Sequence, residues 1–287
     1  MKLGVITDGI SRDFAYALSV MDEYDLPYAE LQFLWDKEVG DLDVEERKRA
    51  LELIKKHDKQ VSCISRHLFA GLPMTTRAGD GTHLEHMDGL KRCIEMSHEF
   101  DCRLVRIMSG RKEMILWGSH GAERWNVAEG AWESCLALIA PAIELARAEK
   151  ITLVVETGNG SMVNSCYTAC KLIDDLNADD VLKVLWDPGN SCWAHETAYP
   201  DAYELIKDDY LGHIHIKDVR VDTPRSHLEV CQMGKGQLAD SFEPIATALR
   251  HDGYDGVISL ESVYHPGNGD FEAGFRLCVE TFKRLFG

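Results

Sequence analysis

Short apolar runs alternate with longer amphipathic stretches along the whole chain. Apolar runs rich in Val, Ile and Leu are typical of buried strands, and the amphipathic stretches are typical of helices. We expect strands at residues 3–8, 29–33, 61–67, 104–110, 151–157, 181–187, 211–218 and 256–262. We expect helices at residues 11–23, 43–57, 83–99, 126–148, 166–176, 198–208, 241–250 and 270–285. Strands that alternate with helices predict βαβ units and a parallel sheet.

The number of repeats and the chain length predict one closed barrel. A chain of 287 residues is ordinary for a (β/α)₈ TIM barrel, and eight strand–helix repeats match its architecture. An open doubly wound sheet usually carries a glycine-rich turn after its first strand, whereas the first strand here leads into "TDGISRDF". No change in composition marks a second domain. We therefore predict a single domain over residues 1–287.

Two connections are longer than those of an average barrel. They read "LFAGLPMTTRAGDGT" (68–82) and "RKEMILWGSHGAERW" (111–125), and the second contains Trp117 and Trp125. Both follow strand carboxyl ends, where a barrel builds its active site. Two interpretations are open for these loops: lids over a ligand, or solvent-exposed and oligomer-contacting segments. A homodimer or homotetramer is compatible with the second.

Charge and composition exclude several classes of partner. The chain has 48 acidic and 31 basic side chains, a formal charge of −17. Such a surface repels nucleic-acid phosphates and anionic membranes, so we expect neither as a partner. No apolar run approaches the roughly 20 residues of a membrane span. The nine cysteines show no paired zinc-binding spacing, and "MKLGVITDG" begins as a strand rather than a signal peptide, so we expect reduced thiols and a cytoplasmic location.

The segment "LGHIHIKD" (211–218) alternates apolar and polar residues. In a strand, His213, His215 and Lys217 would share one face, opposite the isoleucines. His213 would lie deepest, as an interior histidine or as support for a neighbouring ligand. Lys217 would lie at the rim, where it either reaches a substrate oxygen or is solvated.

Four consecutive predicted strands carry a polar residue at or near their carboxyl ends: Glu156, Asp187, His215 and Glu261. Three carboxylates brought together would repel one another and lose hydration, and a divalent cation removes that conflict. The oxygen-rich set favours Mn²⁺ or Mg²⁺, with Co²⁺ or Zn²⁺ as alternatives. A strand-terminal carboxylate can also be a helix N-cap, which is the structural alternative for each one.

The late segment "HIHIKD … MGKGQLADSFEPIATALRHDGYDGVISLE" resembles the xylose isomerase-like TIM-barrel superfamily. Its members include ketohexose 3-epimerases, hydroxypyruvate isomerase, inosose dehydratase and endonuclease IV. The resemblance implies one metal ion on Glu156, Asp187, His215 and Glu261, with the two glutamates as acid and base. The chain departs from the family pattern at Asn190, where a substrate-binding histidine is common, and at Met162, where the epimerases tend to have a glutamate.

These residues predict a metal-dependent sugar isomerase or epimerase. One glutamate would remove the proton next to a carbonyl, the cation would stabilise the enediolate, and the other glutamate would return a proton. The substrate would be a small carbohydrate or polyol. We expect the following residues to bind or orient it: Glu30, His67, Arg106, Asn190 and Lys217, with Trp186 or Trp193 stacking on a sugar face.

Three alternatives stay open from the sequence. A lyase or dehydratase of the same superfamily would use the enediolate to expel a leaving group, in inosose dehydration or in cleavage of a 3-keto-glycoside. Asn190 favours this reading because an amide cannot shuttle a proton near neutral pH. An abasic-site endonuclease is opposed by the charge of −17. A non-catalytic subunit is the remaining class, because fold alone does not set function.

Overall fold

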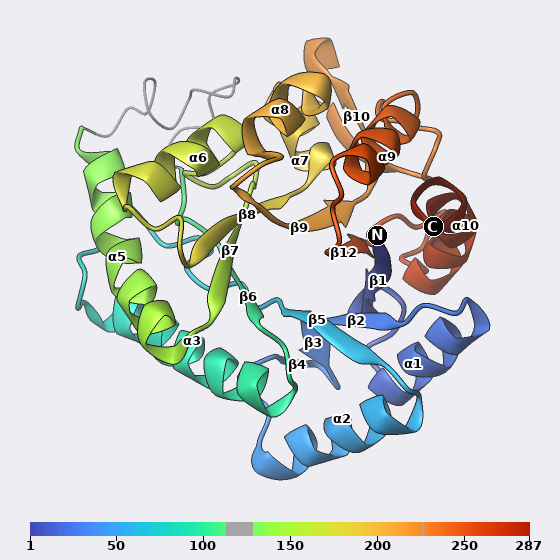
Figure 1. Cartoon of the computed structure of the whole chain (residues 1–287), viewed down its shortest axis with the longest axis horizontal. Helices are drawn as coiled ribbons and strands as arrows, with labels where there is room; N and C mark the ends of the chain where they lie inside the picture. Colours follow the sequence, from blue (N-terminus) through green and yellow to red (C-terminus); the bar gives the residue numbers. More distant parts are fainter. Residues whose placement is uncertain (113–128, 226) are drawn as a thin grey trace. The chain divides into compact units, whose positions relative to one another are not determined.

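The computed structural model describes residues 1–112, 129–225 and 227–287. Its parallel strands close into a barrel in the order β1-β12-β9-β8-β7-β6-β5-β2 (Figure 1). The predicted (β/α)₈ barrel is confirmed. No helix of the described residues is long and apolar enough to cross a membrane.

Every predicted strand is present, each shorter than its apolar run because the last residues of a run leave the ladder. The barrel strands are β1 (Lys2–Ile6), β2 (Tyr28–Leu31), β5 (Gln60–Ile64), β6 (Leu104–Ile107), β7 (Thr152–Glu156), β8 (Leu182–Trp186), β9 (Leu211–Ile216) and β12 (Val257–Leu260). Glu156 is therefore the last residue of its strand, Asp187 and Glu261 directly follow theirs, and His215 is the penultimate residue of β9.

The predicted helices are present within a few residues of their expected limits. They are α1 (Phe14–Glu23), α2 (Val44–Lys56), α3 (Gly81–Glu99), α5 (Ala131–Glu149), α6 (Cys166–Asp175), α8 (Tyr203–Ile206), α9 (Phe242–His251) and α10 (Phe271–Phe286). The stretch expected at 198–208 begins with a separate π-helical turn, η2 (Ala198–Ala202).

Local sequence signals set several helix starts. Asp43 and Glu46 form a reciprocal capping box at the start of α2. The Ser165 hydroxyl accepts a hydrogen bond from the Thr168 backbone N–H at the start of α6. The side chains of Asp13 and Asp270 accept hydrogen bonds from backbone N–H groups at the starts of α1 and α10. These side chains satisfy amide donors that would otherwise lack a partner at each helix start.

The chain divides into two compact units by its internal contacts. Unit 1 comprises Met1–Ser65, Met96–Cys102 and Ile214–Gly287. Within it, β1 pairs in parallel with both β12 and β2, and β2 pairs with β5. Its core includes fully buried aromatic side chains from α1, α9 and α10, namely Phe14, Phe242, Phe275 and Phe282.

Unit 2 comprises Arg66–Glu95 and Arg103–His213. In it β7 pairs in parallel with β6 and with β8. Apolar residues of α5 and α6, among them Leu138, Ile139, Leu172 and Ile173, are buried. Strand β9 is continuous and changes from unit 2 to unit 1 between His213 and Ile214.

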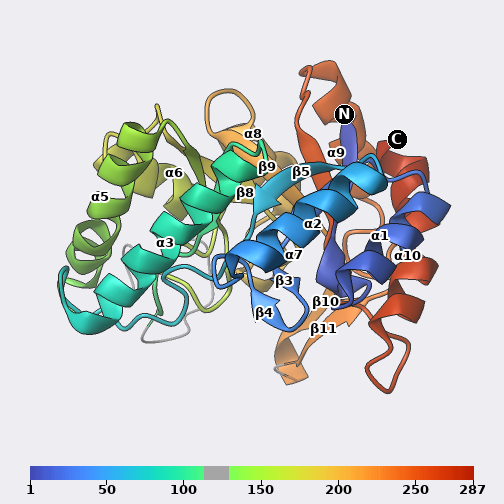
Figure 2. The ribbon, with the colours of Figure 1, turned by 90° about the horizontal axis from the view of Figure 1, so that it is seen from below.

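Two antiparallel hairpins of unit 1 were not predicted. One joins β3 (Phe33–Leu34) to β4 (Lys37–Glu38), and the other joins β10 (Asp218–Asp222) to β11 (His227–Cys231). Each hairpin follows a barrel strand, β2 or β9, and Figure 2 shows both along the lower edge of the view. The strand expected over 211–218 is thus divided, because the chain leaves the barrel after Ile216 and enters a hairpin at Asp218.

The structure describes the first of the two long connections but only the start of the second. Residues 68–80 are irregular, with a backbone hydrogen bond from Leu72 N to Phe69 O and one from Thr76 N to Pro73 O. Of the second connection, 111–125, only Arg111 and Lys112 are described, and Trp117 and Trp125 lie outside the described residues. The expectation of lids or oligomer contacts stays a prediction.

Candidate metal centre

Glu156 is the last residue of β7 and is held by two side chains of unit 2. Arg106 Nη1 donates to Glu156 Oε2 at 2.9 Å, and Asn190 Nδ2 lies 3.4 Å from Oε1. The side chains of Arg106 and Glu156 are 3% and 7% exposed. A buried carboxylate needs such partners because burial removes its hydration. The arrangement fixes Glu156 and balances its charge.

The strand register explains this contact. Arg106 of β6 lies opposite Val154 of β7, and Glu156 follows Val154 by two residues. Side chains two apart on a strand share a face, so Arg106 and Glu156 project to the same side of the sheet. The predicted residue Arg106 therefore contacts the catalytic candidate itself.

Trp186 requires a correction. Leu185 lies opposite Glu156, so the next residue, Trp186, projects to the other face of the sheet. Its side chain is fully buried and its ring packs 5.6 Å from the ring of Tyr203. Trp186 is a core residue, and the expectation that it stacks on a sugar does not fit this position.

Asp187 follows β8 and is the N-cap of α7 (Pro188–Trp193). Its Oδ1 accepts hydrogen bonds from Gly189 N at 2.8 Å and from Asn190 N at 3.2 Å. The structural alternative considered for strand-end carboxylates is thus present here. Capping uses Oδ1, so it is compatible with a ligand role for the other oxygen. Helix α7, which the sequence did not predict, positions Asn190 as well.

Asn190 is 5% exposed and its amide is engaged by the protein. Nδ2 donates to Thr157 O at 2.6 Å in addition to its long contact with Glu156. Both donor hydrogens point to protein groups, so Asn190 would meet a substrate only through its Oδ1 acceptor. Asn190, predicted to bind substrate, therefore donates a hydrogen bond to the backbone carbonyl of Thr157, the residue after Glu156.

Glu196 connects α7 to the start of α6. Its carboxylate accepts hydrogen bonds from Ser191 Oγ and from the backbone N–H groups of Cys166 and Tyr167. Burial raises the pKa of Glu196 above its ordinary value, and these donors partly oppose the effect. The sequence pattern carried no signal for this residue, because it lies in a loop 30 and 29 residues from its two contacts in α6.

In unit 1, His215 of β9 and Glu30 of β2 form a fully buried pair. His215 Nε2 lies 2.8 Å from Glu30 Oε1, and both side chains are 0% exposed. Ser65 Oγ donates to the same oxygen of Glu30. The sequence predicted Glu30 as a substrate contact, whereas here it contacts the candidate metal ligand His215.

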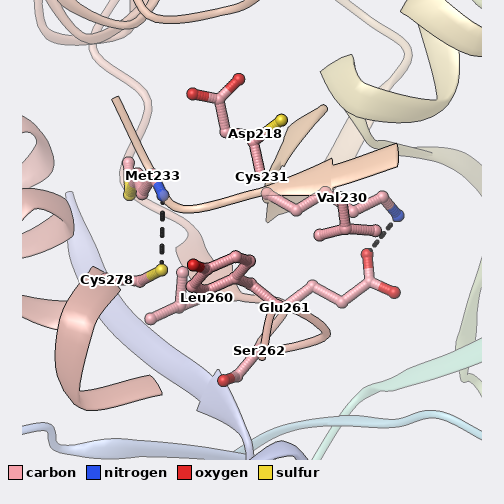
Figure 3. Close-up of a pocket in the computed structure, with 10 residues that line it drawn as sticks. Asp218, Val230, Cys231, Met233, Leu260, Glu261, Ser262 and Cys278 are labelled. Atoms are coloured by element: carbon pink, nitrogen blue, oxygen red, sulfur yellow. Dashed lines mark hydrogen bonds and ion pairs between the residues drawn. The ribbon is translucent and has the colours of Figure 1, made fainter. Parts of the chain in front are cut away.

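Glu261 follows β12 and pairs with Lys217. Lys217 Nζ lies 2.5 Å from Glu261 Oε2, and the side chains are 5% and 18% exposed. Figure 3 marks this ion pair at the side chain of Glu261 with a dashed line. Glu261 N donates to Ile216 O at 2.9 Å, which extends the β9–β12 ladder by one residue. Lys217 is therefore buried and paired, not solvated.

The neighbour of Lys217, Asp218, was missed as a structural centre. Its carboxylate accepts hydrogen bonds from four backbone N–H groups. One belongs to the start of the following hairpin and three to the turn after it: Val219, Gly234, Gly236 and Leu238. A Cβ on Gly236 would lie 2.2 Å from Asp218 Oδ1, so only glycine fits there. This contact gives a physical reason for the spacing of "KD" and "GKG" in the sequence.

His213 and His67 are the two other histidines that the sequence singled out. His213 is fully buried on β9 and, two residues from His215, shares its face. His67 follows β5 and is half-buried. Its role as a substrate contact stays a prediction.

The predicted ligand set fits the chemistry of a divalent cation. Glu156 and Asp187 of unit 2 and Glu261 of unit 1 supply three carboxylates, and His215 of unit 1 supplies one imidazole. Each carboxylate has one oxygen held by a cation or by backbone N–H groups, as described above. Such contacts orient a carboxylate ligand. Oxygen ligands with one imidazole suit Mg²⁺, Mn²⁺ and Zn²⁺.

Solved structures with the same fold include several enzymes. The chain is similar to the probable 3-DHS dehydratase AsbF from Bacillus anthracis, with 15% identity, 96% and 98% of the two chains covered and a TM-score of 0.73. It is similar to the zinc-bound IolI protein, with 16% identity, 100% and 98% coverage and a TM-score of 0.72. It is also similar to D-psicose 3-epimerase from Clostridium cellulolyticum H10, with 12% identity, 100% and 99% coverage and a TM-score of 0.70.

At these identities the solved structures support the fold alone. A search of curated protein sequences returns no match. The sequence model of one family, described as xylose isomerase-like TIM barrel, matches residues 21–281. That range contains every candidate ligand and both glutamate–cation pairs. The chain therefore belongs to the xylose isomerase-like TIM barrel family.

Proposed function

We propose that this protein is a divalent-metal-dependent sugar isomerase or epimerase that moves a proton next to a carbonyl. The ligands would be Glu156, Asp187, His215 and Glu261. The observation that carries the proposal is their place in the chain: each lies at or next to the carboxyl end of β7, β8, β9 or β12, which are consecutive in the barrel. Carboxyl ends of consecutive barrel strands are the place where such folds carry their chemistry.

Charge supports a divalent ion. Glu30, Glu156, Asp187 and Glu261 would contribute four negative charges, and Arg106 and Lys217 contribute two positive ones. A neutral His215 leaves two negative charges in this set, which one divalent cation would balance. When bound, that cation would act as a Lewis acid toward the carbonyl oxygen of the substrate and stabilise the enediolate.

The two glutamates would exchange the proton. Each has an oxygen held by its own cation, Arg106 for Glu156 and Lys217 for Glu261. Such a partner keeps a buried carboxylate ionised and oriented, which a base requires. One glutamate would remove the proton beside the carbonyl, and the other would return one to the opposite face or to the neighbouring carbon.

The remaining polar groups would orient hydroxyls of a small carbohydrate or polyol. Lys217 is a donor beside Glu261, and Asn190 presents its Oδ1 acceptor. His67, half-buried after β5, is a third candidate. These groups differ in donor and acceptor character, which suits a polyhydroxylated ligand.

The first experiment measures bound metal in the purified protein by elemental analysis, beside the double variant His215→Ala/Glu261→Gln. We expect about one divalent ion per chain, lost in the variant. The metal-loaded protein is then incubated in D₂O with a panel of ketoses and keto-sugars. We expect deuterium at the carbon next to the carbonyl, followed by NMR and mass spectrometry.

Matched variants separate chemistry from folding. Glu156→Gln and Glu261→Gln should each slow exchange by about 10²–10⁴-fold, the usual contribution of a positioned acid or base. Glu280→Gln, an exposed glutamate of α10, should exchange like the parent protein. Absence of exchange on every substrate, with metal bound, would reject the isomerase proposal.

Elimination is the second candidate, and Asn190 favours it. Its amide hydrogens bind Thr157 O and Glu156, and an amide cannot relay a proton. A dehydratase or keto-glycoside lyase needs one proton abstraction and the departure of a leaving group. Product masses distinguish the two reactions, because isomerisation conserves mass whereas elimination gives a smaller product and a leaving group.

A further inference from the structure

A continuous polar contact runs through the interior of unit 1, from Ser65 through Glu30 to His215. Ser65 Oγ and His215 Nε2 both contact Glu30 Oε1, the latter at 2.8 Å. All three side chains are fully buried. Core carboxylates are rare because burial of their charge is costly. A packing role alone would be met better by an apolar residue of similar size.

The backbone around Glu30 is built to hold it in place. Thr7 Oγ1 donates to Glu30 O, and Ser65 N donates to Leu31 O at 2.8 Å. The register between β2 and β5 shifts by one residue between Ala29 and Glu30. Such bulges re-aim side chains and are common beside functional sites. The shift places the end of β5, with Ser65, beside the carboxylate of Glu30.

The contact decides which ring nitrogen of His215 carries hydrogen. An ionised carboxylate only accepts hydrogen bonds, so Nε2, which faces Glu30, must donate. In a neutral imidazole the proton on Nε2 leaves the lone pair on Nδ1. Only an unprotonated ring nitrogen can bind a metal ion. Glu30 therefore selects Nδ1 as the atom through which His215 would bind.

We propose that Glu30 is a positioning residue for the metal centre, acting through His215, with Ser65 as its support. This inference rests on the proposed metal site. A carboxylate on the far nitrogen of a histidine ligand orients the ring and increases the basicity of the ligating nitrogen. The predicted direct contact between Glu30 and substrate is replaced by this indirect role.

The first test examines the tautomer in the metal-free, full-length protein. Long-range ¹H–¹⁵N NMR spectra identify the protonated nitrogen of each histidine, and the His215→Gln variant assigns the signals of His215. We expect the proton of His215 on Nε2, the nitrogen that faces Glu30. In Glu30→Gln, the side-chain amide can donate to Nε2, so we expect Nδ1–H to become populated. A His215 with its proton on Nδ1 in the parent protein would overturn the inference.

The second test measures affinity for Co²⁺ alone, by titrating the metal-free protein and following visible absorption. Glu30→Gln should raise the dissociation constant by about 10- to 100-fold, as loss of such a partner usually does. Ser65→Ala should give a smaller increase, and the exposed control Glu280→Gln none. An unchanged constant in folded Glu30→Gln overturns the inference while the proposed metal site stands.

Two further outcomes are decisive. If the parent protein binds no Co²⁺, the proposed function and this inference both fail. If Glu30→Gln does not fold, the parent tautomer and Ser65→Ala decide: a proton on Nε2 together with weakened binding in Ser65→Ala supports the inference. A Ser65→Ala protein with the affinity of the parent then contradicts it.

Discussion

The two catalytic candidates, Glu156 and Glu261, differ in how the fold holds them. Glu156 meets the guanidinium of Arg106, a residue inside strand β6, and both side chains are nearly inaccessible to water. Glu261 meets the ammonium of Lys217, a residue outside any strand, and is 18% exposed. A guanidinium is a rigid, planar donor, whereas an ammonium is a point charge on a flexible stem. The comparison indicates a fixed carboxylate in unit 2 and a more adjustable one in unit 1.

The largest effect is expected from removal of Arg106. Arg106→Met would leave Glu156 buried without its cation, and the free energy of unfolding should fall by about 3–5 kcal/mol. Urea unfolding followed by circular dichroism measures it. Arg276→Met, which breaks exposed pairs with Glu23 and Glu272, is the matched control and should change stability little. Equal losses in the two variants would contradict the description of the Arg106 pair as buried.

Removal of Lys217 should lower the free energy of unfolding less than removal of Arg106. In Lys217→Met, water can reach Glu261 and replace part of the lost contact, so we expect a loss of about 1–3 kcal/mol in the same assay. Lys217→Arg keeps the charge and should recover part of that stability. A loss larger than that of Arg106→Met would reverse the comparison.

The variant Asp218→Ala tests whether the turn at residues 234–238 depends on one carboxylate. Asp218→Ala removes the acceptor of four backbone N–H groups. Hydrogen exchange at Gly234, Gly236 and Leu238 should accelerate at least tenfold, while exchange on β6 and β7 should stay unchanged. Exchange that stays slow at these three amides would show that other contacts hold the turn.

The smallest effect is a pH dependence in unit 2. Burial raises the pKa of Glu196 above its ordinary value of 4.5. Between that value and the raised one, the folded state binds more protons than the unfolded state, so this group lowers stability as pH rises. Melting temperatures across this window should fall less steeply with pH in Glu196→Gln than in the parent. Parallel curves would remove Glu196 as the cause.

The sequence predicted the barrel strands and most helices because their signals are local. Apolar runs marked the strands, and capping residues such as Asp43 and Asp270 lie beside the helices they start. The hairpins and α7 were missed because their elements are only two to six residues long, too short for a clear periodicity. They owe their position to side-chain contacts with the backbone, such as those of Asp187 and Asp218.

Site residues divide in the same way. Glu156, Asp187, His215 and Glu261 could be named because they lie at or next to the carboxyl ends of recognisable strands. The protein contacts of Arg106, Glu30 and Asn190 could not be named from the sequence, since their partners lie 50, 185 and 34 residues away in the chain. Trp186 was misassigned because its face depends on the register of β7 and β8.

The sequence by itself therefore determined the fold class, the candidate ligands and the surface charge. Each depends on periodicity, residue type or composition, which are properties of short segments or of the whole chain. Only the tertiary structure decided which cation accompanies each glutamate, which nitrogen of His215 faces Glu30, and which polar residues support the site. Those contacts join residues distant in sequence, and strand register and burial set them through distances that no local pattern contains.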